Sequence, residues 1–242
     1  MIKDMEDNEN SFVALWSEKV QLDCAVLYAN SVMNDDQFFN RVTDIDINCE
    51  FSRMLESAEK EFVKHNARPF VYSLSNNKLK NAVTERNYLL YDFMHVLQFN
   101  NSQLQVPESI TVRHVDTNNI CDWIDVFCEA FQTENWRNEI TRIVTNALNK
   151  IQFYLAYYNA KPVGCVALFE KNGLLGLYSL GTLSKYRGRG IGTALIVKAA
   201  EIAREKKLAL YLQTFRADGF LDFYAKRGFT EVYVKEIYAK RL

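Results

Sequence analysis

The sequence predicts an α/β protein whose central sheet is mixed, mostly antiparallel and flanked by helices. Two observations in its second half carry this prediction. Strands at 151–158, 163–170 and 174–183 are joined by turns of only four and three residues, and such short turns require antiparallel pairing. A glycine-rich stretch then leads into a helix whose apolar residues fall three or four positions apart between residues 191 and 202.

The first half is also predicted to alternate between helices and strands. Its expected elements are helices at 11–32, 50–66 and 77–87 and strands at 68–75 and 88–99. The polar stretch 100–109 follows and contains Pro107, so it is predicted to be a linker. Two domains are therefore expected, over residues 1–105 and 106–242.

The second half continues the same alternation on both sides of the three strands. Its other expected elements are strands at 109–115, 208–215 and 229–241 and helices at 119–132, 135–149 and 220–227. The residues at 116–119, Asp-Thr-Asn-Asn, can cap the first of these helices. Gly228 stands where a helix ends in the left-handed conformation.

Composition argues against several classes of protein. A net charge of -1 gives no support for nucleic-acid binding, which relies on a basic surface. No stretch reaches the roughly eighteen apolar residues of a membrane span, and the first residues are acidic where a signal peptide would be basic, so a cytoplasmic protein without a membrane partner is expected. The five cysteines form no CxxC pair and accompany only three histidines. We therefore expect no metal site and reduced, buried cysteines.

The glycines are distributed unevenly along the chain. All nine lie at or beyond Gly164. Loops that bring backbone close to a ligand usually need glycine, because it lacks a side chain and tolerates positive φ. A phosphate-binding loop is therefore expected only in the last third of the chain.

One stretch in that last third has the properties of a pyrophosphate site. Gly188, Gly190 and Gly192 alternate along it, so backbone N–H groups can converge where no side chain intervenes. The stretch also forms the start of the predicted helix, with its unpaired N–H donors and positive dipole end. Arg187 and Arg189 add positive charge beside these donors.

Two known phosphate-binding loops do not fit this stretch. A P-loop requires GxxxxGK[ST], and no lysine follows these glycines; a dinucleotide fingerprint requires GxGxxG, and Thr193 stands at its third glycine. The stretch resembles instead the [Q/R]-x-x-G-x-[G/A] loop of the GNAT N-acetyltransferases, with Arg187, Gly190 and Gly192 at its defined positions. Residues 224–229, Tyr-Ala-Lys-Arg-Gly-Phe, resemble the family's Y-x-x-x-G-F segment. The alternative is a glycine-rich turn that serves only packing.

The resemblance covers about residues 109–242 and implies a GNAT acyl-CoA N-acyltransferase fold. It also implies an enzyme that uses acetyl-CoA as co-substrate and needs no metal. In that family pantetheine lies beside a strand that diverges from its neighbour at a bulge. Leu180, Gly181 and Thr182 match that strand, and a glycine at 181 suits a bulge. A backbone N–H at the bulge would polarise the acetyl carbonyl. The residues matched to pyrophosphate binding are Arg187, Gly188, Arg189, Gly190, Ile191, Gly192 and Thr193.

The resemblance also implies a catalytic acid but no base. Tyr224 matches the tyrosine that protonates the departing coenzyme sulfur in many family members; its structural alternative is a partly buried aromatic residue on an amphipathic helix. No carboxylate lies in the strand at 174–183, a common place for the base. The base could then be water, the amine could arrive neutral, or one of four glutamates could serve: Glu129, Glu134, Glu139 and Glu170. Ala217 stands where the family often has an asparagine that contacts the coenzyme.

The first half resembles a degenerate copy of the second. Residues 68–99 and 208–240 both read as strand, short helix and strand, and Arg86-Asn87-Tyr88 aligns with Arg227-Gly228-Phe229. Asparagine is the residue after glycine that best tolerates a left-handed helix end. We therefore expect an N-terminal, partial GNAT-like α/β domain without a coenzyme loop, whose strands at 70–75 and 88–99 lie side by side. The alternative is an unrelated extension.

The expected activity is direct transfer of an acetyl group from acetyl-CoA to a primary amine. A small-molecule amine is the first choice of acceptor, and a peptide N-terminus or lysine side chain is the second. A non-catalytic acyl-CoA-binding regulatory module is the alternative from a different class. Acceptor specificity resides in loops that vary on a shared fold, so the sequence does not decide the acceptor.

Overall fold

The computed structural model describes residues 1–100 and 102–240 and divides them into two compact units. Unit 1 comprises residues 1–9, 97–213 and 221–231; unit 2 comprises residues 10–96, 214–220 and the last stretch from 232. The division does not follow the single boundary expected near residue 105, because two long strands, β5 (Tyr88–Phe99) and β11 (Phe229–Lys240), each supply residues to both units. Residue 101 of the expected linker and residue 241 of the expected last strand lie outside the described residues.

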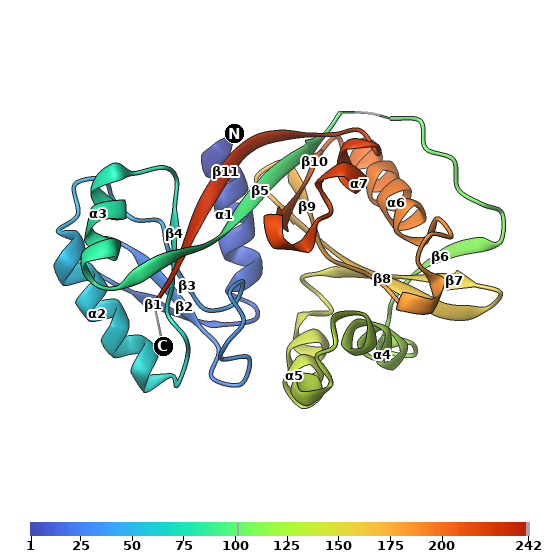
Figure 1. Cartoon of the computed structure of the whole chain (residues 1–242). Coiled ribbons are helices and arrows are strands. Elements are labelled where there is room, and N and C mark those ends of the chain that lie inside the picture. Colours follow the sequence, from blue (N-terminus) through green and yellow to red (C-terminus); the bar gives the residue numbers. More distant parts are fainter. Residues whose placement is uncertain (101, 241–242) are drawn as a thin grey trace. The chain divides into compact units, whose positions relative to one another are not determined.

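Unit 1 contains most of the second half of the chain (Figure 1). Its strands are β6 (Ile110–His114), β7 (Gln152–Tyr158), β8 (Lys161–Lys171), β9 (Leu174–Thr182) and β10 (Ala209–Phe215), of which residues up to Gln213 belong to this unit. The unit also contains one end of β5 and one end of β11. Its helices are α4 (Ile120–Phe131), α5 (Arg137–Ala147), α6 (Ile191–Lys206), α7 (Leu221–Ala225) and the first residues of α1 (Ile2–Val13). Every helix and strand expected after residue 109 is present, with ends shifted by at most a few residues.

The sheet of unit 1 is mixed, as predicted. Strands β6, β7, β8 and β9 pair antiparallel in sequence order, and β10 pairs parallel with β9 after the α6 crossover. Figure 1 shows α6 on one face of these strands and α4 and α5 on the other. The predicted apolar stripe of α6, from Ile191 to Ile202, is buried in the core of this unit, where α6 packs on β8 and β9.

The start of α1 is held to unit 1 by a buried polar network. The Asn8 amide donates hydrogen bonds to the carbonyls of Phe169, Lys171 and Leu174 at 3.3, 3.3 and 3.4 Å. Its oxygen accepts from the hydroxyls of Tyr178 and Tyr211 at 2.8 and 3.0 Å. Because buried polar groups are costly unless they are paired, this network anchors the first residues of the chain to β8, β9 and β10.

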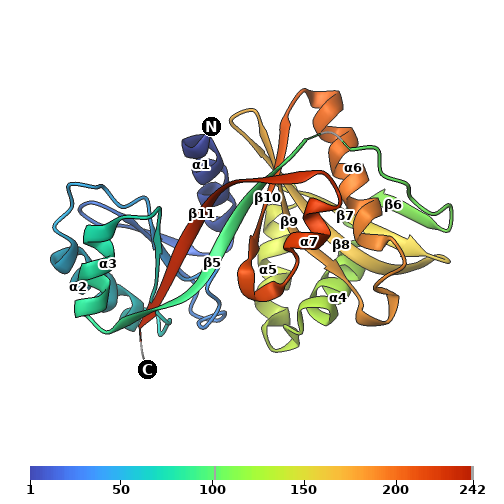
Figure 2. The same ribbon diagram turned by 45° about the horizontal axis from the view of Figure 1, so that its top comes forward.

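Unit 2 is an α/β unit with its own apolar core. Its strands follow the order β1 (Glu18–Gln21), β2 (Val26–Ala29), β3 (Arg41–Thr43), β4 (Phe70–Ser73), β11 and β5. Helices α2 (Phe51–Lys64) and α3 (Asn77–Glu85) pack on this core, and Figure 2 shows them together on one side of its strands. The helix expected at 11–32 is wrong: α1 ends at Val13 and β1 and β2 follow. All four residues of β2 are buried, and periodicity cannot distinguish a fully buried short strand from a helix.

The expectation that the strands at 70–75 and 88–99 lie side by side is also wrong. Strand β11 lies between β4 and β5, and it pairs antiparallel with β4. The same insertion occurs between β10 and β11, where β5 is the inserted strand. In each strand–helix–strand segment, the two strands are therefore separated by the last strand of the other segment. That the first half is a degenerate GNAT-like domain stays a prediction.

The aligned helix ends of the two halves adopt the same conformation. Asn87 has φ +62° and Gly228 has φ +84°, so both lie in the left-handed region. The residues that follow, Tyr88 and Phe229, are both buried. The expectation that asparagine replaces glycine at a left-handed helix end is therefore confirmed at Asn87.

The cysteines differ in part from the expectation that all are reduced and buried. Cys24 and Cys49, 25 residues apart, are disulfide-bonded with their Cα atoms 5.7 Å apart. Cys128 and Cys165 are free and buried, whereas Cys121 is free and exposed. The pairing was missed because one cysteine lies in the β1–β2 turn and the other before α2, a spacing that no short motif marks. None of the helices in residues 1–100 and 102–240 combines the length and the apolar character of a membrane span.

Candidate functional site

A β-bulge interrupts the pairing of β8 with β9 in unit 1. Cys165 pairs with Gly181 and Ala167 pairs with Tyr178, so two β9 residues, Ser179 and Leu180, face a single residue of β8. Ser179 has φ +53°, a conformation that L-residues rarely adopt. The expected bulge is therefore present, but it begins two residues before Gly181.

The glycine at position 181 is required by the packing of α4 against β9, not by the bulge. A Cβ atom at this position would lie 2.8 Å from the Phe131 ring and 3.0 Å from the Ala130 side chain, both at the end of α4. Only glycine lets the helix approach the strand this closely. The bulge is thus flanked by α4, whose Phe131 side chain is 42% exposed despite its large apolar ring.

Strands β9 and β10 stop pairing immediately before the bulge. Their parallel ladder extends from the pair Leu174–Ala209 to the pair Leu177–Leu212. Of residues 178–182, Tyr178, Gly181 and Thr182 pair with β8, whereas the backbone ladder with β10 ends at Leu177 in the described residues. Beyond Leu177 this edge of β9 is therefore not taken up by the ladder with β10, and it can face a ligand with amide groups of its own.

The glycine loop follows β9 and turns into α6. Gly188 and Gly190 have φ values of +78° and +88°, so both require glycine. Gly190 is the N-cap residue of α6 and provides no side-chain cap. The first N–H groups of the helix therefore have no intrahelical partner and receive no hydrogen bond from a side chain of the N-cap residue, which is the arrangement expected of an anion site.

The two loop arginines lie beside these N–H groups in contact with neutral partners. The Arg187 Nε atom donates a hydrogen bond to the Thr182 carbonyl at 3.3 Å. The Arg189 guanidinium lies 5.3 Å above the Tyr158 ring and 3.4 Å from its hydroxyl. These contacts orient the arginines without cancelling their positive charge.

The other expected coenzyme residues differ in exposure. Leu180 and Thr182 are half-buried on β9. Ile191 is buried in the core, so only its backbone faces the loop. Thr193 is buried in the first turn of α6, and Gly192 lies against α7, since a Cβ there would be 3.1 Å from the Phe223 ring.

Tyr224 lies on α7, the short helix that contacts the start of α6. It is 7% exposed, and its ring packs edge-on against Phe223 and Phe229 at centroid distances of 5.1 and 5.7 Å. The packing is that of a core aromatic residue, and the catalytic role of the hydroxyl stays a prediction.

Arg227 is a residue that the sequence analysis did not single out. Its Nε atom donates to the Thr193 hydroxyl at 2.8 Å, and its Nη1 atom donates to the Phe223 carbonyl at 2.7 Å. It therefore connects α7 to the first turn of α6. Two features of the sequence could have drawn attention to it, its position between the motif residues Tyr224 and Gly228 and its alignment with Arg86, but the motif leaves that position undefined.

Three of the four glutamates considered as bases are held in ion pairs. Glu134 pairs with Arg137, which lowers the pKa of that carboxyl. Glu139 pairs with Arg142 at 2.6 Å, and Glu170 pairs with Lys206 at 2.5 Å. The fourth, Glu129, is exposed on α4. None of these contacts favours a carboxylate acting as general base.

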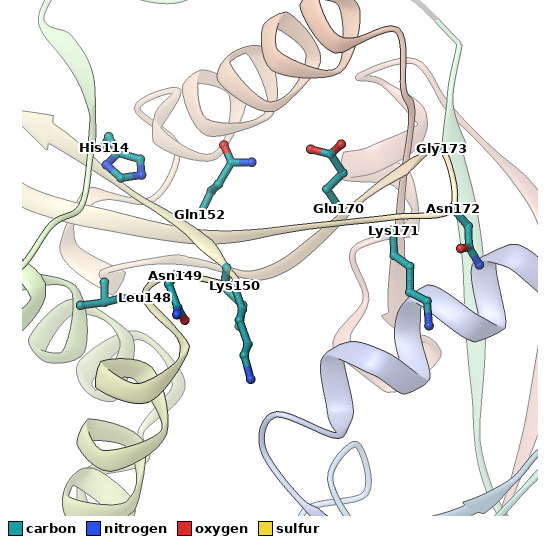
Figure 3. Close-up of a pocket in the computed structure, with 10 residues that line it drawn as sticks. His114, Leu148, Asn149, Lys150, Gln152, Glu170, Lys171, Asn172 and Gly173 are labelled. Carbon is teal, nitrogen blue, oxygen red and sulfur yellow. The ribbon is translucent and has the colours of Figure 1, made fainter.

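A separate polar hollow of about 400 Å³ lies elsewhere in unit 1 (Figure 3). Its lining includes His114, Gln152, Glu170 and Lys171, near the β8–β9 turn. The bulge lies toward the opposite end of β9, and a strand rises about 3.3 Å per residue. The hollow is therefore distinct from the bulge and the glycine loop. Within the described part of the chain, no group of three or more metal-binding side chains occurs.

Comparison with known proteins adds to this geometry. Residues 118–229 match the model of the acetyltransferase (GNAT) family. An uncharacterised N-acetyltransferase of Methanocaldococcus jannaschii is 22% identical over 81% of this chain and 84% of its own length. A probable N-acetyltransferase of Drosophila melanogaster, named san, is 36% identical over 36% of this chain and 52% of its own length.

Solved structures share the fold over nearly the whole chain. A GCN5-related N-acetyltransferase from Kribbella flavida aligns with a TM-score of 0.74 and 15% identity, covering 98% of this chain and 95% of that one. A functionally unknown protein from Staphylococcus epidermidis aligns with a TM-score of 0.70 and 17% identity, covering 93% and 94%. At these identities the likeness concerns the fold, and it includes the first half of the chain.

Proposed function

We propose that this chain, which belongs to the GNAT family of acetyltransferases through residues 118–229, transfers the acetyl group of acetyl-CoA directly to a primary amine. One observation carries the proposal. Strand β9 leaves β10 after Leu177, bulges at Ser179 and Leu180, and leads within a few residues to the open N-terminus of α6. A strand edge that is no longer paired with β10, followed by an anion site, suits a ligand with an amide-containing arm and phosphates.

The residues of this segment fit the parts of the coenzyme in order. The edge of β9 at Leu180, Gly181 and Thr182 would pair with the pantetheine amides. The loop from Arg187 to Thr193 would hold the pyrophosphate through its backbone N–H groups, helped by the charges of Arg187 and Arg189.

The protein's own groups then have two tasks. Acetyl-CoA supplies the acetyl group as a thioester, whose carbonyl oxygen gains negative charge during attack by the amine. A backbone N–H at the bulge would stabilise that charge, because it is fixed in place before the reaction. The Tyr224 hydroxyl would give its proton to the departing sulfur.

The acceptor is proposed to be a small-molecule amine. The acceptor would bind on the side of the bulge that α4 borders, because the exposed Phe131 ring of α4 lies against Gly181 beside the bulge. Because Glu134, Glu139 and Glu170 are committed to ion pairs, the amine would enter in its neutral form or lose its proton to water. That these three glutamates are held in ion pairs also favours the second candidate function, a non-catalytic acyl-CoA-binding module.

A panel assay separates these candidates. The protein is incubated with acetyl-CoA and small amines, amino acids or short peptides, while a thiol reagent records coenzyme release and mass spectrometry identifies acetylated product. We expect acetylated small amines, with release above that of the same reaction lacking the amine. Acetylated peptides alone would favour the protein acceptor. Tight coenzyme binding without any acetylated product would favour the non-catalytic module.

A further inference from the structure

The Arg227 guanidinium is half-buried at the start of α6. It stacks 3.6 Å from the centroid of the Phe223 ring and donates to the Thr193 hydroxyl and the Phe223 carbonyl. All three partners are neutral. No carboxylate among the described residues pairs with Arg227, and burial lowers its pKa below the ordinary value, because desolvation disfavours the charged form.

The Arg227 charge lies beside the N-terminus of α6, where a positive charge is unfavourable. Thr193 lies in the first turn of α6, where the helix dipole places partial positive charge. A cation held there is unfavourable unless an anion joins it. The Thr193 oxygen already accepts the hydrogen bond from Arg227, so the hydroxyl proton can itself be donated to an acceptor.

The first half of the chain shows how the same arginine is satisfied without a ligand. Arg86 precedes a left-handed Asn87, as Arg227 precedes a left-handed Gly228. Arg86 is held by two hydrogen bonds from Nε and Nη2 to the Glu59 carboxylate of α2, at 3.2 and 2.7 Å. Glu59 raises the pKa of Arg86. In unit 2 the counterion is thus built into the protein.

We propose that the counterion of Arg227 is a phosphate group of the bound coenzyme, which Arg227 and the Thr193 hydroxyl bind together. This inference rests on the proposed function and extends it to a residue outside the glycine loop. It also explains a difference between the two halves. Arg86 is paired by Glu59 and needs no phosphate, whereas Arg227 has the geometry of a binding residue.

The test compares Arg227→Gln with wild type by calorimetric titration of three ligands. Acetyl-CoA carries all phosphates, its 3′-dephospho form lacks one, and acetyl-pantetheine carries none. We expect the variant to bind acetyl-CoA roughly 10- to 100-fold more weakly, the effect of losing a charged hydrogen bond. Affinity for acetyl-pantetheine should fall far less than affinity for acetyl-CoA. An effect that vanishes with the dephospho form assigns the 3′-phosphate, and one that persists assigns the pyrophosphate.

Two further variants keep the test decisive. Arg227→Lys retains the charge and should lose less affinity than Arg227→Gln. Arg86→Gln is the matched control and should leave coenzyme affinity unchanged, even where thermal unfolding shows that it weakens unit 2. Equal losses with acetyl-CoA and acetyl-pantetheine would show a purely structural role, and unchanged acetyl-CoA binding would also overturn the inference. Failure of folded wild-type protein to bind acetyl-CoA would instead overturn the proposed function, and this inference with it.

Discussion

A Gly192→Asp variant is expected to fold normally and to bind acetyl-CoA roughly 100- to 1,000-fold more weakly than wild type, since two like charges about 4 Å apart cost on the order of 4 kcal/mol near a protein surface. Gly192 occupies the second position of α6, where an acidic side chain suits the helix dipole. Its new Cβ would lie 3.1 Å from the end of the Phe223 ring, so that ring needs to move only slightly. The measurement is calorimetric titration after thermal unfolding has confirmed the fold.

The matched control for this prediction is Gly192→Asn. Asparagine has nearly the same size as aspartate but no charge, so it separates repulsion of phosphate from steric blockage. A smaller loss for asparagine than for aspartate indicates an anion at the helix start. If both variants bind acetyl-CoA as wild type does, the pyrophosphate does not lie at Gly192.

Replacing Tyr224 with phenylalanine is expected to lower kcat by about 100-fold or more, the lower end of what a positioned general acid contributes. Affinity for acetyl-CoA should hardly change. The ring contacts with Phe223 and Phe229 survive the substitution, so stability should change little. Steady-state rates with a small amine, together with calorimetric titration of the coenzyme, measure the two effects separately.

Tyr154→Phe provides the comparison for Tyr224. Tyr154 is also 7% exposed and belongs to the same apolar cluster of unit 1. Its hydroxyl lies 3.4 Å from the Gln152 side chain, at the start of β7. Its loss should leave kcat near the wild-type value. Equal rates for wild type and Tyr224→Phe would remove Tyr224 from the mechanism and leave it as a core residue.

The sequence predicts the parts of the site that depend on local conformation. Gly188 and Gly190 adopt the positive φ values for which glycine is needed, and α6 begins at Ile191 as expected. The short turns at 159–162 and 171–173 correctly predict antiparallel neighbours. These features follow from a few neighbouring residues, so they can be read without knowledge of the rest of the chain.

Features that depend on distant residues were placed less well. The bulge lies at Ser179, because the register of β9 against β8 decides it and not the glycine at 181. Gly181 is instead required by α4, some fifty residues earlier in the chain. The insertion of β11 between β4 and β5 depends on strands more than a hundred residues apart. No spacing in the sequence records such a pairing.

Arg227 shows the same limit at the level of a single side chain. That no described carboxylate pairs with it becomes visible only when its contacts are compared with those of Arg86. A sequence shows two arginines before two helix ends, but not which of them already has a counterion.

A crystal structure of the protein with acetyl-CoA would show directly whether β9 and the glycine loop bind the coenzyme. We expect pantetheine along the edge of β9 at Leu180–Thr182 and phosphate oxygens at the N–H groups of the loop from Gly188 to Thr193. Ordered coenzyme bound elsewhere, for example in the polar hollow beside His114 and Glu170, would contradict it. So would a structure at saturating acetyl-CoA in which strand β9 and the loop bind nothing.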